Sequence, residues 1–537
     1  MVAAGLRTSG RPAGGTVQVG NGLFAQVSTN LVSLGGAHFQ VQQATFHAGA
    51  LLVSAPSSPS GSSLTLTNCI LAELTALSAG SIELSGSHNG FYNSPQLGAF
   101  RFLSTAYPFQ AVAGGRYYLS EASGFRNVGS TNLSTPLLAQ LRQKTTYAPL
   151  IRSNVTVAAD ITLRPVALRD TDLPDLGYHY EPLDYLAWRW GFSNCLVSLR
   201  GGVVIGYYDE TGLWLQGGAA LESEGTPLGL NRFTDYRTVQ EQPVKLGSWA
   251  NSCGLPLNPA RLDGGSPAPV RLRFTVFSRL ARGGFGGYDL YAMGHWRFSQ
   301  LEVQDCAFHG GVVMLYAGPG SGAGPMGLTN NLWQRQSVSF LGEPTLGLYH
   351  NLFKDCPAVS FDVWGGSSLL RDNVFDSVVL DDMFDPPPTH SHNAYINVRD
   401  DRGNPARLEP PQTGDVVLAD FNYAAGPLGP FYQPTNSPLL NAGSRSAAEA
   451  GLYHFTVLTN QTKAGLLGNG RVSIGYHYVA VDANGNPVDT DGDGMPDYGE
   501  DSNGNGSGAD DPTSWLTYNS VHGLVAGQGL VVFTPLK

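Results

Sequence analysis

Charged residues are scarce in this chain, and their scarcity excludes several classes of protein. They make up 14% of the 537 residues, against about 25% in a typical soluble protein. The net charge is −11, so the chain lacks the basic surface that a nucleic acid needs, whereas a negative charge suits hydrated cations. No apolar run reaches the roughly 18 residues of a membrane-spanning helix. We therefore expect neither a nucleic-acid partner nor a membrane span.

Cysteines and helix-forming runs are also sparse. An odd, scattered set of cysteines without a CxxC pair is not a disulfide framework, and we expect small buried apolar side chains. The five are Cys69, Cys195, Cys253, Cys306 and Cys356. Long amphipathic runs rich in lysine and glutamate are absent, while the chain holds 68 glycines and 34 prolines. This composition favours strands and turns over helices.

A short repeat is present in the second half of the chain. Its units pair an asparagine with an aromatic residue two places on: Asn331-Leu332-Trp333, Asn351-Leu352-Phe353, Asn373-Val374-Phe375 and Asn393-Ala394-Tyr395. The asparagines lie 20, 22 and 20 residues apart. Such a period indicates a solenoid, and leucine-rich repeats are excluded because their LxxLxL signature is missing. We predict a parallel β-helix whose asparagines stack as a ladder at one turn, with the aromatic rings stacked inside.

The chain also contains a longer duplication. The sequence SHNGFYN at 87–93 matches SHNAYIN at 391–397, and LGYHY at 176–180 matches IGYHY at 474–478. Before both of these matches, Phe46-His47 aligns with Phe308-His309. The matches are collinear, which indicates two related modules.

The predicted fold class is all-β: a right-handed parallel β-helix solenoid with two tandem related modules and a C-terminal calcium-binding tail. We expect an incomplete first module with an irregular end cap at 1–184 and a fuller second module with its cap at 185–480. A calcium-binding segment at 481–512 and a tail or junction at 513–537 follow. The first module has no counterpart to the opening coils of the second, so we expect missing N-terminal coils. The export signal, which this chain does not show, would lie there.

The segment DTDGDGMPDYGE at 489–500 carries a metal-binding pattern. Ca²⁺ takes six to eight oxygen ligands in a tight loop, with a glycine at the sharp turn. Gly494 stands at that turn, and the predicted ligands are Asp489, Asp491, Asp493, the Met495 carbonyl, Asp497 and Glu500. A second, degenerate loop follows with Asp501, Asn503 and Asn505, but Pro512 occupies its twelfth position.

These tandem loops resemble the thrombospondin type 3-like calcium repeats of secreted bacterial proteins. The resemblance covers only this segment and implies an extracellular setting. The coils resemble the right-handed parallel β-helix superfamily of exported bacterial proteins, whose members include pectate lyases, polygalacturonase-like hydrolases, adhesins and passive stalks. The resemblance therefore implies a fold without choosing among these functions.

One stretch, LDDMFDPPPTHSH, is a candidate active site. In β-helix hydrolases paired carboxylates act as general acid and base, and in β-helix lyases carboxylates hold calcium while an arginine or lysine takes the proton. The weak catalytic candidates are Asp381, Asp382 and Asp385, with Arg371 and Arg399 as bases. The alternative is a solvated turn between coils. We interpret the repeated histidines His179 and His477 as parts of a structural terminus, and His47 and His309 as hydrogen-bonded at turns.

Two functional hypotheses follow. The first is a non-catalytic exported or cell-surface repeat protein, stabilised by calcium, that acts as a scaffold, adhesin or carbohydrate-contacting module. Its partner would be a polysaccharide or another cell-surface component. The alternative is a secreted polysaccharide lyase or glycosidase. The second hypothesis requires that the acids and arginines of 371–402 converge on one exposed face of a sheet.

Overall fold

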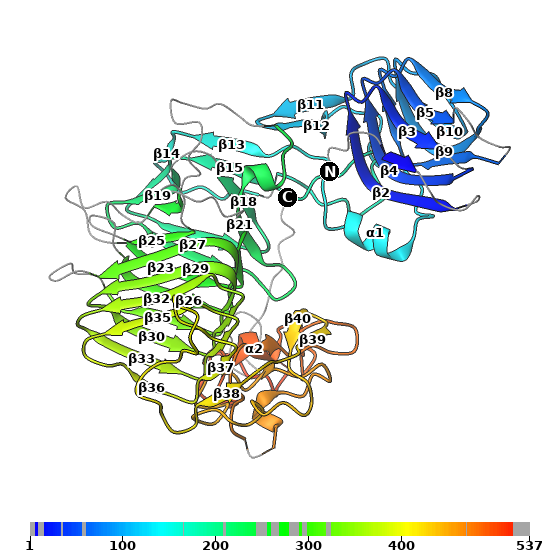
Figure 1. Cartoon of the computed structure of the whole chain (residues 1–537). Coiled ribbons are helices and arrows are strands. Elements are labelled where there is room, and N and C mark those ends of the chain that lie inside the picture. The colour runs from blue at the N-terminus through cyan, green and yellow to red at the C-terminus, as the bar shows by residue number, and fades with distance from the viewer. Residues whose placement is uncertain are drawn as a thin grey trace.

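The structure is a computed structural model, and it shows an all-β parallel solenoid (Figure 1). It describes residues 6–8, 15–33, 36–55, 61–164, 166–207, 211–242, 255–258, 268–278, 289–292, 298–317, 324–468 and 470–518. In that part of the chain, neither α-helix has the length and apolar character of a membrane span. Cys253 and residues 519–537, most of the predicted tail, lie outside the described residues.

The N-terminal unit has two parallel sheets followed by an irregular cap. Its four-stranded sheet contains β1 (Leu6–Thr8), β3 (Thr29–Ser33), β5 (Leu51–Ala55) and β8 (Ala76–Gly80). The second sheet contains β2 (Thr16–Ala25), β4 (His38–His47), β6 (Ser63–Thr67), β7 (Ile70–Ala72), β9 (Glu83–Tyr92) and β10 (Ala99–Leu103). The cap contributes the hairpin of β11 (Phe109–Val112) and β12 (Gly115–Leu119), and α1 (Thr135–Leu141).

The larger unit has three parallel sheets. The longest contains β13 (Leu150–Ser153), β15 (Tyr185–Trp188), β18 (Val204–Tyr207), β21 (Asn231–Asp235), β24 (Thr275–Ser278), β25 (Leu290–Ala292), β27 (Ala307–Ala317), β29 (Leu332–Gly342), β31 (Leu352–Lys354), β32 (Ala358–Val363), β34 (Val374–Asp376), β35 (Leu380–Phe384), β37 (Ala394–Ile396) and β38 (Val416–Leu418). The eight-stranded sheet contains β17 (Leu196–Arg200), β20 (Ala220–Glu224), β23 (Ala268–Arg273), β26 (Phe298–Gln304), β28 (Met326–Thr329), β30 (Thr345–Tyr349), β33 (Ser367–Arg371) and β36 (Thr389–Ser391). The four-stranded sheet contains β14 (Thr156–Val157), β16 (Trp190–Ser193), β19 (Thr211–Gln216) and β22 (Leu255–Asn258).

Short elements complete the larger unit. They are η1 (Tyr236–Thr238), the hairpin of β39 (Ala424–Gly426) and β40 (Gly429–Tyr432), the pair β41 (Phe455–Thr456) and β42 (Tyr478–Val479), η2 (Ala464–Leu466) and α2 (Asp497–Glu500). The strands β13 and β14 fall within residues 1–184, yet they pair with β15 and β16 and so begin the sheets of the larger unit.

The predicted asparagine ladder is present and runs through successive coils. The Oδ1 atom of Asn351 accepts hydrogen bonds from the Asn331 backbone N–H (3.2 Å) and from Asn331 Nδ2 (3.0 Å). Asn373 Oδ1 accepts the same two hydrogen bonds from Asn351, and Asn393 Oδ1 accepts them from Asn373. Each amide also donates to a backbone carbonyl; Asn351 Nδ2, for example, lies 2.8 Å from the Leu328 oxygen. Because these groups are buried, the ladder satisfies polar atoms that water cannot reach.

The ladder has defined ends. At its upper end the Cys306 N–H donates to Asn331 Oδ1 (2.9 Å). At its lower end the Asn393 N–H donates to Asp415 Oδ1 (2.9 Å). Cys306 therefore occupies the ladder position one coil before Asn331, in place of an asparagine. Among the described residues of the N-terminal unit the same contact occurs once, from the Cys69 N–H to Asn89 Oδ1 (2.8 Å).

The predicted aromatic column fills the interior beside the ladder. Seven rings lie nearly parallel along it: Phe233, Phe277, Phe308, Trp333, Phe353, Phe375 and Tyr395. The closest pair, Phe308 and Trp333, has ring centroids 4.1 Å apart and an interplanar angle of 3°. Each buried ring removes a large apolar area from water, so each coil is stabilised by its neighbours.

Three cysteines confirm the predicted apolar role. Cys69, Cys306 and Cys356 are buried and carry free thiols. Burial raises the pKa of the Cys69 and Cys356 thiols to about 12, so these thiols are neutral at ordinary pH. Cys195 is half-buried and also free.

The two caps dock onto their solenoids through the same contacts. Asn21 donates to the His179 carbonyl (2.9 Å) and accepts from its N–H (2.7 Å). Asn330 makes both bonds with His477, at 2.8 and 2.7 Å. These contacts make the coil of Asn21 the counterpart of the coil of Asn330. The sequence alignment, which pairs the coil of Phe46 with the coil of Phe308, predicts a different correspondence between the two units.

Replacing Asn351 with alanine tests the ladder. The change removes the acceptor of three buried donors, namely the Asn331 N–H, Asn331 Nδ2 and Trp333 Nε1. An orphaned buried donor costs about 1–3 kcal/mol, so we expect the free energy of unfolding to fall by at least about 2 kcal/mol. Denaturant unfolding followed by tryptophan fluorescence measures this loss. The exposed Asn422 provides the control, and an equal effect of Asn422→Ala and Asn351→Ala would contradict the ladder's role.

Candidate functional site

The acidic loop begins with three aspartates folded around their own backbone. Asp489 accepts hydrogen bonds from the N–H groups of Gly492 (2.8 Å) and Gly494 (2.9 Å). Asp491 accepts from the Asp493 N–H (3.2 Å), and Asp493 accepts from the Met495 N–H (2.9 Å). Gly494 has a φ of +99°, which glycine adopts without strain. One carboxylate oxygen from each of the three aspartates lies within 4.8 Å of the others.

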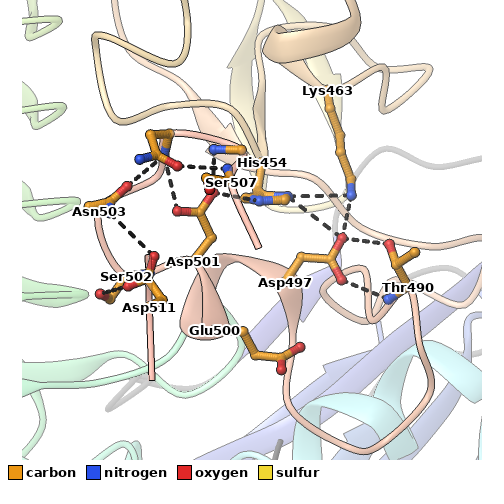
Figure 2. Close-up of polar contacts among 12 residues, drawn as sticks. His454, Lys463, Thr490, Asp497, Glu500, Asp501, Ser502, Asn503, Ser507 and Asp511 are labelled. Carbon is orange, nitrogen blue, oxygen red and sulfur yellow. Dashed lines mark hydrogen bonds and ion pairs between the residues drawn. The ribbon is translucent and has the colours of Figure 1, made fainter. Parts of the chain in front are cut away.

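Asp497 and Glu500, the last two predicted ligands, lie on α2 and are both only 1% exposed. Asp497 Oδ2 accepts a hydrogen bond from Thr490 Oγ1 (2.7 Å) and forms an ion pair with Lys463. Figure 2 shows Asp497 turned toward Lys463 and Thr490, whereas Glu500 projects from the other side of the helix. The structure therefore separates Asp497 from the three aspartates that share an oxygen cluster.

The donor set fits a hard cation. All the groups are oxygens, as Ca²⁺ prefers. The Asp491 Oδ2 atom is buried and has no hydrogen-bond partner among the described residues. Desolvation, together with the nearby carboxylates of Asp493 and Asp489, raises the pKa of Asp491 above its usual value. A cation in the loop would relieve this repulsion.

The second loop repeats the first with Asn503 and Asn505 in place of two of its aspartates. Asp501 accepts from the N–H groups of Asn505 (3.0 Å) and Gly506 (2.5 Å), as Asp489 accepts from Gly494. The side-chain amide of Asn505 then donates to Asp510 Oδ2 (2.7 Å). In the second loop a side-chain amide therefore lies against a carboxylate, whereas the cluster in the first loop consists of carboxylates alone.

His454 connects the two loops to the cap, and the sequence analysis missed it. Its Nε2 lies 2.9 Å from Asp501 Oδ2, and its Nδ1 lies 3.6 Å from Asp497 Oδ2 (Figure 2). Lys463, which pairs with Asp497, also comes from the cap. The tail is thereby fixed to the cap by opposite charges and hydrogen bonds at buried positions. Neither residue belongs to a local motif, so only the tertiary structure places them here.

The structure disperses the candidate catalytic acids. Asp381 and Asp382 are consecutive residues of β35 and point to opposite faces of the sheet. Asp382 is the register neighbour of the buried Phe361 and accepts a hydrogen bond from the Glu409 N–H (3.3 Å); burial raises its pKa. Asp381 and Asp385 are exposed.

Of the two candidate arginines, one lies on another sheet and one lies beside the acids. Arg371 ends β33 in the eight-stranded sheet, whereas Asp381 and Asp382 belong to the long sheet. Arg399 is exposed and lies on the coil next to β35, because it pairs with Val379 and its carbonyl accepts a hydrogen bond from the Leu380 N–H (2.8 Å); its side chain donates to the Gly403 carbonyl (3.1 Å). The structure therefore does not bring all the candidate acids and arginines to one exposed face, although the exposed Asp381 and Arg399 lie on adjacent coils.

No protein-family model and no curated protein matches this sequence.

The cap histidines occupy structural positions in both units. His179 Nε2 lies 2.6 Å from Asp170 Oδ2. His477 has no such carboxylate, and its Nε2 is buried without a hydrogen-bond partner among the described residues. His47 is the last residue of β4 and contacts the Tyr107 hydroxyl (3.1 Å) and Glu73 (3.3 Å). His309 is hydrogen-bonded as expected, to Gln334 (3.1 Å), but it lies within β27 and not at a turn.

The pH dependence of stability tests the state of His477. Burial, together with the nearby His350, lowers the pKa of His477 to about 3, against about 6.5 in an unfolded chain. Between these values the unfolded chain binds the proton, so acid destabilises the fold by up to about 1.4 kcal/mol per pH unit from this group. We expect the slope of unfolding free energy against pH, from 6.5 down to 4, to be shallower in His477→Gln. An unchanged slope would show that His477 is not the responsible group.

Proposed function

We propose that this protein is a non-catalytic, exported or cell-surface solenoid that acts as a scaffold, adhesin or carbohydrate-contacting module. The observation that carries this proposal is that Asp381 and Asp382 point to opposite faces of β35 while Arg371 lies in another sheet. Paired-carboxylate hydrolysis needs two carboxyl groups about 5–9.5 Å apart on either side of one substrate bond, and Asp381 and Asp382 point to opposite faces of their strand. The continuous ladder and aromatic column also favour a rigid rod.

We further propose that calcium stabilises the tail. Asp489, Asp491 and Asp493 would hold the ion, with the Met495 carbonyl and Glu500 completing the loop. Asp497 is part of the predicted ligand set, but its contacts with Lys463 and Thr490 give it a docking role. The bound ion would neutralise the clustered carboxylates. The resemblance to thrombospondin type 3-like repeats supports an extracellular setting, where sites of about 10⁻⁴–10⁻³ M suffice.

We also infer that the two units are related modules. The same pair of hydrogen bonds fixes His179 and His477 to an asparagine, and a tyrosine stack follows in each cap. Tyr118 and Tyr180 have ring centroids 4.2 Å apart, and Tyr432 and Tyr478 have centroids 4.3 Å apart. Collinear sequence matches and repeated long-range contacts both support duplication.

Thermal unfolding with and without calcium tests the metal site. Calcium at 10 mM should stabilise the tail by about 2.7 kcal/mol if the site has a Kd of about 10⁻⁴ M, and so raise the Tm by a few degrees. Asp491→Asn should abolish this increase. Asp510→Asn makes the same change of charge in the second loop and should retain it. A Tm that calcium does not move, in protein shown to be folded, would overturn the calcium proposal.

A digestion screen tests the absence of catalysis. The folded protein, with and without calcium, would be incubated with pectin, alginate, glycosaminoglycans and fucoidan. We expect neither unsaturated products, which absorb near 235 nm, nor new reducing ends. Unsaturated products would identify a lyase, and new reducing ends alone would identify a glycosidase; either result overturns the proposal.

A further inference from the structure

A groove crosses the outward face of the eight-stranded sheet. It has a volume of about 560 Å³ and is lined by residues of β26, β28, β30, β33 and β36. Its volume falls within the range of roughly 300–1,000 Å³ that is typical of ligand sites. In Figure 1 these strands form the part of the larger unit that carries the labels β26, β30, β33 and β36.

Two glycines form the floor of the groove. Gly327 and Gly347 are register neighbours on β28 and β30, and they face outward because the residues flanking them in each strand are buried. Glycine inside a strand costs roughly 0.5–1 kcal/mol relative to alanine and often marks a place where another molecule approaches the backbone.

The two glycines differ in what they accommodate. A Cβ at Gly347 would lie 2.8 Å from the ring of Tyr349, so this glycine makes room for that ring. A Cβ at Gly327 would meet no atom within 4 Å. Packing therefore gives no reason for the missing side chain at Gly327, and the space above it is open.

The N-terminal unit fills the same position with side chains. Gln18 precedes Asn21 by three residues, as Gly327 precedes Asn330, and both asparagines hold a cap histidine. On the next strand Gln40 corresponds to Gly347. Gln18 Nε2 donates to Gln40 Oε1 (3.2 Å) across this surface. The groove thus exists because the larger unit has glycines where the related unit has a glutamine pair.

An uncompensated cation borders the groove. The guanidinium of Arg371 forms no ion pair or hydrogen bond with the described residues, and its Nε is buried without a partner. Leaving a buried charged donor unsatisfied is costly. Guanidinium groups bind carboxylates and sulfates through paired hydrogen bonds. The acidic residue in the groove, Glu302, already pairs with Arg271 (2.8 Å).

We propose that this groove binds an acidic glycan, with an anionic group of the sugar at Arg371 and a sugar ring over Gly327 beside Tyr349. The amide of Gln300 and the hydroxyls of Thr345 and Ser367 border the same groove and can bind sugar hydroxyls. Arg445 lies with its Cζ 5.2 Å from the centre of the Tyr349 ring and so helps to fix that ring. The inference rests on the carbohydrate-contacting role proposed above and assigns it a surface and a ligand class.

Calorimetric titration of the full chain tests the site. The probes are hexagalacturonate, hexamannuronate and a heparin hexasaccharide, with maltohexaose as the neutral comparison. We expect saturable binding of at least one acidic probe and weaker binding of maltohexaose. Gly327→Gln, which copies Gln18, and Arg371→Gln should each weaken that binding at least tenfold. Arg402→Gln removes a charge from a side chain that is 84% exposed and should leave binding unchanged within twofold.

The possible outcomes distinguish a failure of the proposed groove site from a failure of the proposed carbohydrate-contacting function. If the acidic probes bind and Gly327→Gln and Arg371→Gln bind as tightly as the wild type, the groove is overturned while a carbohydrate contact elsewhere stands. If the acidic probes do not bind and maltohexaose does, the groove is overturned and a carbohydrate contact elsewhere stands; if none of the four sugars binds, the groove and the carbohydrate-contacting role are both overturned. We expect both variants to keep the wild-type Tm, because Gly327 has room for a side chain and Arg371 forms no ion pair with the described residues. An unchanged Tm then excludes misfolding as the cause of weaker binding. The calcium response of the tail is independent of either result.

Discussion

The hydrogen bond between stacked asparagine side chains is the interaction on which the larger unit depends. Each coil must turn between sheets, and the turn leaves backbone donors and acceptors in a place that water does not reach. In the Asn351 side chain, Oδ1 accepts a hydrogen bond from Asn331 of the preceding coil, and Nδ2 donates one to the Leu328 carbonyl. Buried amides are strong only when fully satisfied, so the ladder fixes the register of every coil it crosses. The aromatic column can then stack at a constant position.

This regularity explains which parts of the fold the sequence predicts. The ladder and column recur with a fixed spacing, so their pattern is visible in one chain. The equivalence between units is harder to predict, because neighbouring coils of a solenoid resemble one another. Phe46-His47 resembles Phe308-His309 in sequence, yet the cap contacts pair the coil of Asn21 with that of Asn330. A cap touches one particular coil, and that contact is long-range.

The same distinction applies to the candidate sites. The aspartates of the acidic loop fold around neighbouring backbone groups, so local spacing predicts their cluster. His454 and Lys463 reach the tail across 47 and 34 residues, and spacing gives no sign of them. The divergence of Asp381 and Asp382 was predictable, because adjacent residues of a strand point to opposite faces.

A solenoid separates positions that hold the coils together from positions that are free to change. Inward residues of β28 and β30 are buried against neighbouring coils, whereas outward residues contact only their neighbours on the surface. At two outward positions Gln18 and Gln40 have counterparts in Gly327 and Gly347, and the buried residues beside these glycines are unaffected. A binding surface can therefore arise on one unit without loss of the ladder or column. For the same reason, the tail that Lys463 and His454 hold against the cap can take up the proposed calcium ion without altering the coils.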